Sequence, residues 1–195
     1  MEHELDSLGE EPLEPLSTRR LRLRRPLETD ASRIAELAGD RSVAEMLAHV
    51  PHPYRMADAE DFLEVAARSV VFAVTLAEND RFIGICGLRP TERAGAGDLG
   101  YWLGRPYWGQ GYATEAAQAV VDLAFETAGL TCVLAGCRAI NGRSRRVLEK
   151  CGFQYRGTST FVSRAAGRVS SEQFGLERRT WEALRSWGRL DAAAC

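Results

Sequence analysis

The sequence predicts one domain with an α+β (mixed α/β) fold, and three observations support this prediction. The chain has 195 residues, of which 45% are hydrophobic, enough for one sizeable core but too few for two ordinary domains. Its hydrophobic pattern switches between a period of two and a period of about 3.6, which are typical of strands and helices. The segments follow the order strand, helices, three strands, helix, strand, helix, two strands. This order favours a mixed, largely antiparallel sheet of about seven strands flanked by about four helices over a doubly wound fold.

The N-terminal segment, residues 1–17, is expected to be an acidic, disordered leader. It carries six acidic side chains, two prolines and no Lys or Arg. A single domain is expected to span residues 18–190. Within it, residues 20–24 alternate apolar and polar side chains, which predicts a half-buried strand that Pro26 ends.

Helical patterns come next in the chain. Thr29 and Asp30 are favourable capping residues for a helix over 31–37, whose apolar residues share one face. Two further helical patterns cover residues 43–48 and 57–68. Together these segments predict a helical layer that precedes most of the sheet.

Three strands are expected in the middle of the chain. Residues 70–76 and 81–88 are strand-like and are separated by Glu78-Asn-Asp80, a hairpin turn by composition. A third strand, 98–103, follows a glycine-rich turn at 94–97.

The C-terminal half alternates between the two kinds of element. Residues 113–128 carry a broad apolar stripe at helical spacing. Residues 131–138 are almost all apolar, which is typical of a strand buried on both faces. A helix is expected over 141–152, followed by a closing hairpin of strands 153–163 and 169–177.

Composition excludes several classes of function. The net charge of -2 argues against a nucleic-acid partner. No apolar run approaches the roughly 18 to 20 residues of a membrane span and no signal peptide pattern opens the chain, so a cytoplasmic protein without a membrane partner is expected. The five cysteines form no CxxC pair, and His49 and His52 flank Pro51 with no third ligand near, so no metal site is expected.

The segment Tyr101–Ala116 (YWLGRPYWGQGYATEA) joins a strand to a helix through two close glycines. Backbone N–H groups at a helix start have no internal partners and favour anions, and Gly109 and Gly111 have no side chains to keep a phosphate away. A nucleotide triphosphate loop would need a lysine, which is missing here, and a dinucleotide fingerprint would need a third glycine where Thr114 stands. The pattern xxGxG or xxGxA, whose amides wrap a pyrophosphate, fits residues 109–113.

This segment resembles the coenzyme A loop of the GNAT N-acetyltransferase superfamily, and its flanks resemble the RimJ/RimL-like branch, which acetylates protein N-termini. The resemblance covers residues 18–185 and includes the patterns at 18–30 and 141–153. It implies a GNAT fold whose sheet is splayed between strands 4 and 5, here residues 98–103 and 131–138, with acetyl-CoA as cosubstrate in the gap. One departure is Trp108, where the superfamily usually has arginine or glutamine.

The resemblance also implies which residues bind the coenzyme. Backbone N–H groups near residues 101–103 would hold the thioester carbonyl, the glycine loop would hold the pyrophosphate, and the residue that caps the next helix would bind the pantetheine arm. The expected cofactor-binding residues are Tyr101, Trp102, Leu103, Trp108, Gly109, Gln110, Gly111, Tyr112, Ala113, Thr114 and Asn141.

Acetyl transfer needs an uncharged amine, stabilisation of the oxyanion and a proton for the departing thiolate. Asp98 shares a strand face with Gly100 and Trp102 and is the candidate base, directly or through a water; a surface aspartate that ends a turn is the alternative. Leu148 replaces the tyrosine that protonates the thiolate in many GNAT enzymes. Ser144 is therefore the candidate for donating to the sulfur or hydrogen-bonding the pantetheine; the alternative is a solvated helical serine.

The expected function is acetyl transfer from acetyl-CoA to a primary amine in a ternary complex. An α-amine with a pKa near 7.8 is roughly 10 to 15% neutral at pH 7, whereas a lysine is neutral at only about 0.04%, so a weak base suffices for an N-terminus. This arithmetic and the resemblance to the RimJ/RimL-like branch together favour a protein N-terminal α-amine as the acceptor. A small amine or antibiotic, and a non-catalytic coenzyme A-binding regulatory module, stay open as alternatives. The protein is expected to be a monomer or homodimer.

Overall fold

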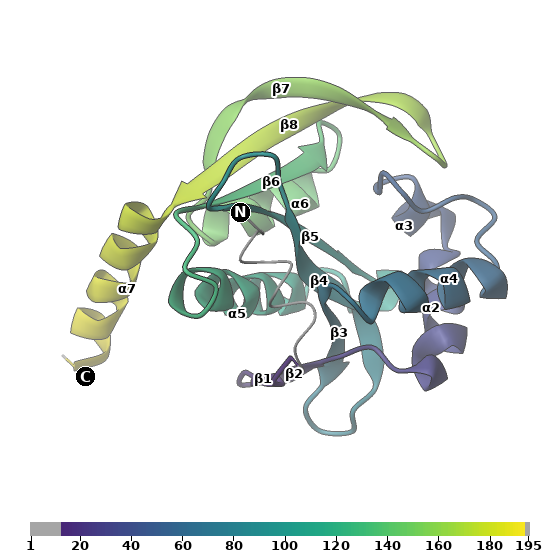
Figure 1. Ribbon diagram of the computed structural model, residues 1–195, viewed down its shortest axis with the longest axis horizontal. Coiled ribbons are helices and arrows are strands. Elements are labelled where there is room, and N and C mark those ends of the chain that lie inside the picture. The colour runs from purple at the N-terminus through teal and green to yellow at the C-terminus, as the bar shows by residue number, and fades with distance from the viewer. Residues whose placement is uncertain (1–12, 194–195) are drawn as a thin grey trace.

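The computed structural model describes residues 13–193, and in that part of the chain one eight-stranded sheet organises the fold (Figure 1). Its strand order is β1-β2-β3-β4-β5-β6-β8-β7. Neighbouring strands are antiparallel except β5 and β6, which are parallel. The strands are β1 (Leu16–Ser17), β2 (Leu21–Arg24), β3 (Val70–Leu76), β4 (Phe82–Pro90), β5 (Ala96–Leu103), β6 (Cys132–Arg138), β7 (Gln154–Ser163) and β8 (Gly167–Glu177).

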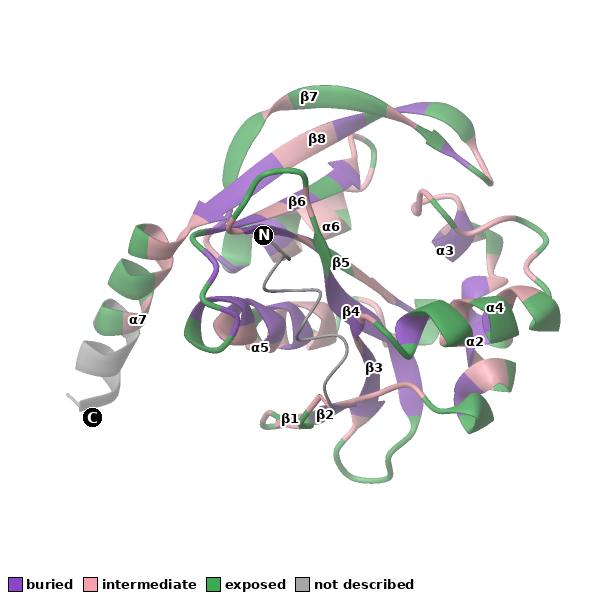
Figure 2. Cartoon of the chain, viewed as in Figure 1, coloured by how far each residue is buried: buried purple, intermediate pink, exposed green. Residues whose placement is uncertain are grey.

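Helices cover both faces of this sheet (Figure 1). The helices are α2 (Ala31–Ala38), α3 (Arg41–Ala44), α4 (Met56–Ala66), α5 (Tyr112–Glu126), α6 (Gly142–Lys150) and α7 (Arg178–Ala193), with short 3-10 turns η1 (Glu28–Asp30) and η2 (Arg105–Tyr107). Side chains alternate across a strand, so Phe72 and Val74 of β3 join the core under α5 and α6. Ala73, between them, joins the smaller core under α2 and α4. Figure 2 shows β3 and β4 largely buried and the edge strand β7 largely exposed.

The predicted splay lies between β5 and β6. Their parallel pairing covers only four residue pairs, from Ala96 with Cys132 to Leu99 with Ala135. β6 goes on pairing with β8 as far as Arg138, and β5 goes on pairing with β4 as far as Leu103. The two strands therefore separate after Leu99, and the mixed, mostly antiparallel and splayed sheet that the sequence predicted is confirmed.

Apart from the helix expected over 43–48, the expected elements are present with small shifts at their ends, and two further elements were missed. The sheet has eight strands rather than about seven because Leu16–Ser17 pairs with β2. The described residues contain six α-helices rather than about four, and the helix α7 was not expected. Of the predicted leader, residues 1–12 lie outside the described residues, while its last two residues form β1.

The helix expected over 43–48 was misplaced. α3 begins at Arg41 because the Asp40 carboxylate accepts a hydrogen bond from the Ser42 amide at 2.8 Å, and it ends at Ala44. In the turn after it, residues 45–48, three backbone carbonyls accept hydrogen bonds from distant parts of the chain. They accept from Arg138 (to Glu45, 2.6 Å), the Ser163 hydroxyl (to Leu47, 2.8 Å) and the Arg164 amide (to Ala48, 2.9 Å). Long-range contacts, which local sequence does not encode, replace the helical bonds here.

No helix among the described residues is both long enough and apolar enough to span a membrane.

Candidate functional site

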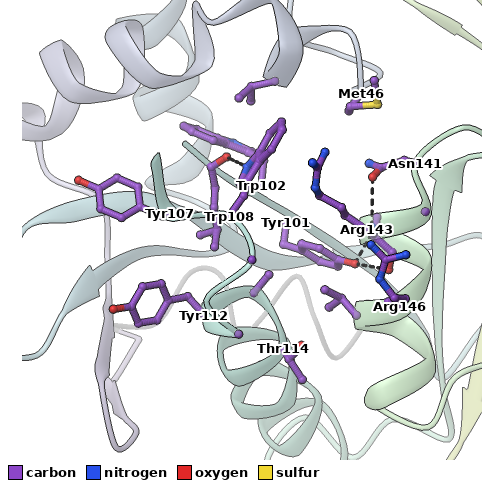
Figure 3. Close-up of a pocket in the computed structure, with 18 of the residues that line it drawn as sticks. Met46, Tyr101, Trp102, Tyr107, Trp108, Tyr112, Thr114, Asn141, Arg143 and Arg146 are labelled. Carbon is purple, nitrogen blue, oxygen red and sulfur yellow. Dashed lines mark hydrogen bonds between the residues drawn. The ribbon is translucent and has the colours of Figure 1, made fainter. Parts of the chain in front are cut away.

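A cavity of about 520 Å³ opens where β5 separates from β6 (Figure 3). Its walls come from three parts of the chain: α3 with the turn after it (within residues 42–47), the end of β5 with the glycine segment (within 101–114), and α6 with the two residues before it (within 140–150). Cavities of this size hold small molecules and cofactors. The splay and the cavity thus share one location.

Ten of the eleven predicted coenzyme-binding residues line this cavity. They are Tyr101, Trp102, Leu103, Trp108, Gly109, Gly111, Tyr112, Ala113, Thr114 and Asn141. The exception is Gln110, whose side chain donates to the Pro106 carbonyl at 3.0 Å, away from the cavity.

The glycines of the segment have the backbone conformation that side chains disfavour. Gly109 has φ +77° and Gly111 has φ +84°. A Cβ at Gly109 would meet no atom within 4 Å, so it is the backbone angle rather than crowding that requires glycine there. The chain turns through them into α5, whose first internal bond runs from the Glu115 amide to the Gly111 carbonyl at 3.1 Å. The amides of Tyr112, Ala113 and Thr114 are not used by the helix, and these three residues line the cavity.

An unpredicted ionic contact holds this loop. The Glu115 carboxylate accepts from the Thr18 hydroxyl (2.6 Å), the Arg20 amide (2.8 Å) and the Arg20 side chain (2.7 Å). Arg20 also donates to the Gln110 carbonyl at 2.9 Å. Burial alone would raise the pKa of Glu115, but these hydrogen bonds outweigh it and lower that pKa. Thr18, Arg20 and Glu115 all fall within the sequence patterns that carry the resemblance, but no local signal says that they meet.

Trp108 links the loop to the strand before it. Its indole N–H donates to the Leu103 carbonyl at 2.7 Å, and the Arg143 guanidinium lies 5.2 Å from its ring centre. The tryptophan that departs from the usual pattern therefore fixes the start of the loop and contacts α6.

Three predicted residues come together at the start of α6 (Figure 3). The Asn141 side chain caps the helix by accepting from the Ser144 amide at 3.1 Å. The Ser144 hydroxyl lies 2.8 Å from the Tyr101 hydroxyl, and both residues line the cavity. Burial raises the pKa of Tyr101, so this phenol is protonated at neutral pH. Leu148, which stands where the resemblance implied a tyrosine, is fully buried.

Asp98 lies apart from this group. It belongs to the stretch of β5 that is still paired with β6, and it does not line the cavity. Its carboxylate forms an ion pair with Arg89 at 2.5 Å, and Arg89 also contacts the His49 ring nitrogen at 2.9 Å. Burial, followed by the charges of Arg89 and Arg164, lowers the pKa of His49. The structure thus brings Ser144, but not Asp98, to the cavity.

The charged side chains that line the cavity are all basic. Among the described residues that line it, the charged ones are Arg143, Arg146 and Lys150, all from α6, and none is acidic. Together with the open amides at the start of α5, they favour an anionic ligand such as a diphosphate. The described residues contain no group of three or more His, Cys, Asp or Glu side chains arranged to hold a metal ion.

Comparison with known proteins agrees with this geometry. A family model described as an acetyltransferase (GNAT) domain matches residues 20–154. The uncharacterised N-acetyltransferase p20 of Bacillus licheniformis is 28% identical over 177 residues, which cover 87% of this chain and 99% of p20.

Two solved structures share the fold at low sequence identity. The ribosomal-protein-S5-alanine acetyltransferase of Vibrio fischeri matches with a TM-score of 0.70 and 19% identity, over 87% of this chain and 99% of that one. The microcin C7 self-immunity acetyltransferase MccE, solved in complex with acetyl-CoA and AMP, matches with a TM-score of 0.72 and 15% identity, over 82% of this chain and 93% of that one. The same layout of sheet and helices therefore occurs in acetyltransferases of different kinds.

Proposed function

Because the chain belongs to the GNAT acetyltransferase family, we propose that it transfers the acetyl group of acetyl-CoA to the α-amine of a protein N-terminus. Family membership makes the protein an N-acetyltransferase that depends on acetyl-CoA. The choice of a protein N-terminus as the acceptor goes beyond family membership. It is supported by the resemblance to the RimJ/RimL-like branch and by a structural neighbour that is named for an alanine of a ribosomal protein.

The observation that carries the proposal is the start of α5 at the splayed gap. The amides of residues 109–114 would hold the pyrophosphate of the coenzyme, and the cations of α6 would add charge. Past Leu99, the edge of β5 that faces β6 has no strand partner among residues 13–193. Its backbone groups are therefore available to the pantetheine arm and, near Tyr101–Leu103, to the thioester carbonyl.

The proposed reaction is direct transfer in a ternary complex. The neutral amine attacks the thioester carbon, the new C–N bond forms, and the C–S bond breaks with loss of the coenzyme thiolate. Ser144 is proposed to donate to the departing sulfur or to hydrogen-bond the pantetheine. The Tyr101 hydroxyl supports this role, because when it donates to the Ser144 oxygen, the Ser144 proton is left free to point into the cavity.

Asp98 is proposed to receive the amine proton through a water. The water is needed because Asp98 does not line the cavity and its carboxylate is paired with Arg89. An acceptor α-amine makes this weak arrangement sufficient, since about a tenth of such amines are already neutral at pH 7. The proposed location is the cytoplasm, where protein N-termini are made, and the proposed assembly is a monomer or homodimer.

The test is release of free thiol from acetyl-CoA with a panel of acceptors, alongside calorimetric titration of acetyl-CoA. The panel holds peptides that start with Ser, Ala or Met, and also spermidine and kanamycin. Thiol release with the peptides supports the N-terminal acceptor. Release only with the small amines assigns the enzyme to the small-amine alternative, and binding of acetyl-CoA without any release assigns it to the regulatory alternative.

A further inference from the structure

The wall of the cavity opposite the glycine loop is largely apolar. Its apolar residues are Val43 in α3, Met46 and Leu47 in the turn after it, and Ile140 just before α6, and Ser42 of α3 also lines the cavity. In Figure 3, Met46 lies on the other side of Tyr101 from Thr114. Because the proposed function places the coenzyme along the loop and β5, this opposite wall is left for the acceptor. We call these four residues the acceptor wall.

Part of this wall is not explained by the packing of the fold. Ile140 lines the cavity although its side chain is 69% exposed, and Met46 is only partly buried. An exposed apolar side chain at the mouth of a cavity gains stability only when a ligand covers it. Ile140 is therefore accessible to a molecule bound in the cavity.

The wall offers no partner for a second positive charge. No described residue that lines the cavity carries a carboxylate. Of the acidic residues near this wall, Glu45 is paired with Arg41, Asp98 with Arg89, and Glu172 with Arg145 through one of its two carboxylate oxygens. The Asp40 carboxylate accepts hydrogen bonds from the amide and hydroxyl of Ser42. Under the proposed function the cations of α6 are matched by coenzyme phosphates, which leaves the acceptor side close to neutral. An ammonium group buried there without a partner loses its hydration and gains nothing in return.

The wall is also held in place before any acceptor binds. The carbonyls of residues 45, 47 and 48 accept the three hydrogen bonds from Arg138, Ser163 and Arg164 described above. These donors come from β6 and from the tip of the β7–β8 hairpin. The turn therefore presents a preformed surface to the acceptor.

We propose that the acceptor is a peptide N-terminus whose first two residues carry no positive charge, and that Met46 and Ile140 select it by contacting its first side chains. This inference rests on the proposed function and narrows its substrate class. Amines that carry further cations close by, such as polyamines, aminoglycosides and peptides with lysine at position two, are rejected because each extra ammonium finds no carboxylate.

The experiment compares matched acceptors on the full-length enzyme by thiol release. The probes are two peptides that differ only in position two, Ala-Leu against Ala-Lys, together with spermidine and kanamycin. We expect kcat/KM for the Ala-Leu peptide to exceed that for the Ala-Lys peptide by at least about tenfold, because burial of an unpaired charge is costly. Equal values, or a preference for the cationic acceptors, would overturn the inference.

Two pairs of variants test the named residues. Met46→Glu and Ile140→Glu place a carboxylate in the wall, and Met46→Leu and Ile140→Val keep it apolar. The glutamate variants should shift the ratio of the two peptides toward Ala-Lys by about tenfold, while the apolar variants keep the ratio of the wild type. An unchanged ratio in both glutamate variants would remove Met46 and Ile140 from specificity.

The outcome separates this inference from the function on which it rests. An enzyme that binds no acetyl-CoA, or releases no thiol with any amine, contradicts the proposed function itself. If the enzyme acetylates the Ala-Lys peptide as fast as the Ala-Leu peptide, the proposed function stands and only the inference about the acceptor wall is contradicted.

Discussion

The hydroxyl groups of Tyr101 and Ser144 lie 2.8 Å apart in the cavity, and the Asn141 side chain fixes the backbone of Ser144 beside them. If Ser144 assists the departing sulfur, Ser144→Ala lowers kcat roughly 100-fold with little change in the dissociation constant of acetyl-CoA. Tyr101→Phe removes one oxygen from the same contact and should lower kcat by a smaller factor. Steady-state kinetics and calorimetry measure the two quantities separately, and full turnover in Ser144→Ala would exclude the serine from the mechanism.

The proposed role of Asp98 as proton acceptor can be tested with a single substitution. Asp98→Asn keeps the size of the side chain but cannot take a proton, so kcat for a peptide acceptor should fall roughly 100-fold at pH 7 if the carboxylate acts through a water. Glu45→Gln is a matched control, since Glu45 is likewise paired with an arginine, Arg41. Equal activity in both variants would show that Asp98 serves only its ion pair with Arg89.

The backbone conformation at the start of α5 should control the affinity for acetyl-CoA. Gly111→Ala places a side chain at φ +84°, which costs about 1–2 kcal/mol of backbone strain and disturbs the amides that face the cavity. We expect the dissociation constant of acetyl-CoA to rise by about tenfold in calorimetric titration. Gly167→Ala, at φ +71° at the start of β8, carries similar strain at a residue that does not line the cavity and should leave binding unchanged. Equal losses in both variants would mean that general destabilisation, not the loop, is responsible.

The contact between the N-terminal segment and α5 concerns the stability of the whole molecule. The pKa of Glu115 is lowered in the folded state from its ordinary value of 4.5, so its hydrogen bonds stabilise the fold above that value and are lost as the pH falls through the lower folded pKa. At pH 7, Glu115→Gln should reduce the free energy of unfolding by about 1–3 kcal/mol.

Urea unfolding at pH 7 and at about pH 3 checks this prediction. The difference between wild type and variant should shrink at the lower pH. Glu126→Gln is a control on the same helix, because Glu126 is exposed and paired with Arg185. A Glu115→Gln deficit that is the same at both pH values would contradict the assigned pKa direction.

Much of this architecture follows from patterns that local sequence carries. Alternation in β3 and the apolar stripe of α5 place both elements, and Gly109 and Gly111 mark the turn between β5 and α5 because few other residues adopt positive φ. The resemblance, rather than the pattern, supplied the splay and the coenzyme. Ten of the eleven predicted coenzyme-binding residues line one cavity.

The features that sequence did not reveal depend on contacts between distant segments. α3 ends at Ala44 because its following carbonyls bond to Arg138, Ser163 and Arg164. The Glu115 contact joins residues 95 and 97 positions apart. Arg89, the partner of Asp98, lies directly opposite it on the neighbouring strand β4, and the alternation of side chains within one strand does not reveal such a pair.

Because β5 and β6 pair over only four residues each, a cosubstrate bound between them should also stabilise the folded protein. Four residue pairs join the β1–β5 portion of the sheet to the β6–β8 portion, so a molecule lodged in the gap acts as a clamp between them. Saturation at about one hundred times the dissociation constant would add about 2.7 kcal/mol to the unfolding free energy. Binding of acetyl-CoA should then slow deuterium uptake first at the amides of β6 beyond Ala135, where β6 is no longer paired with β5.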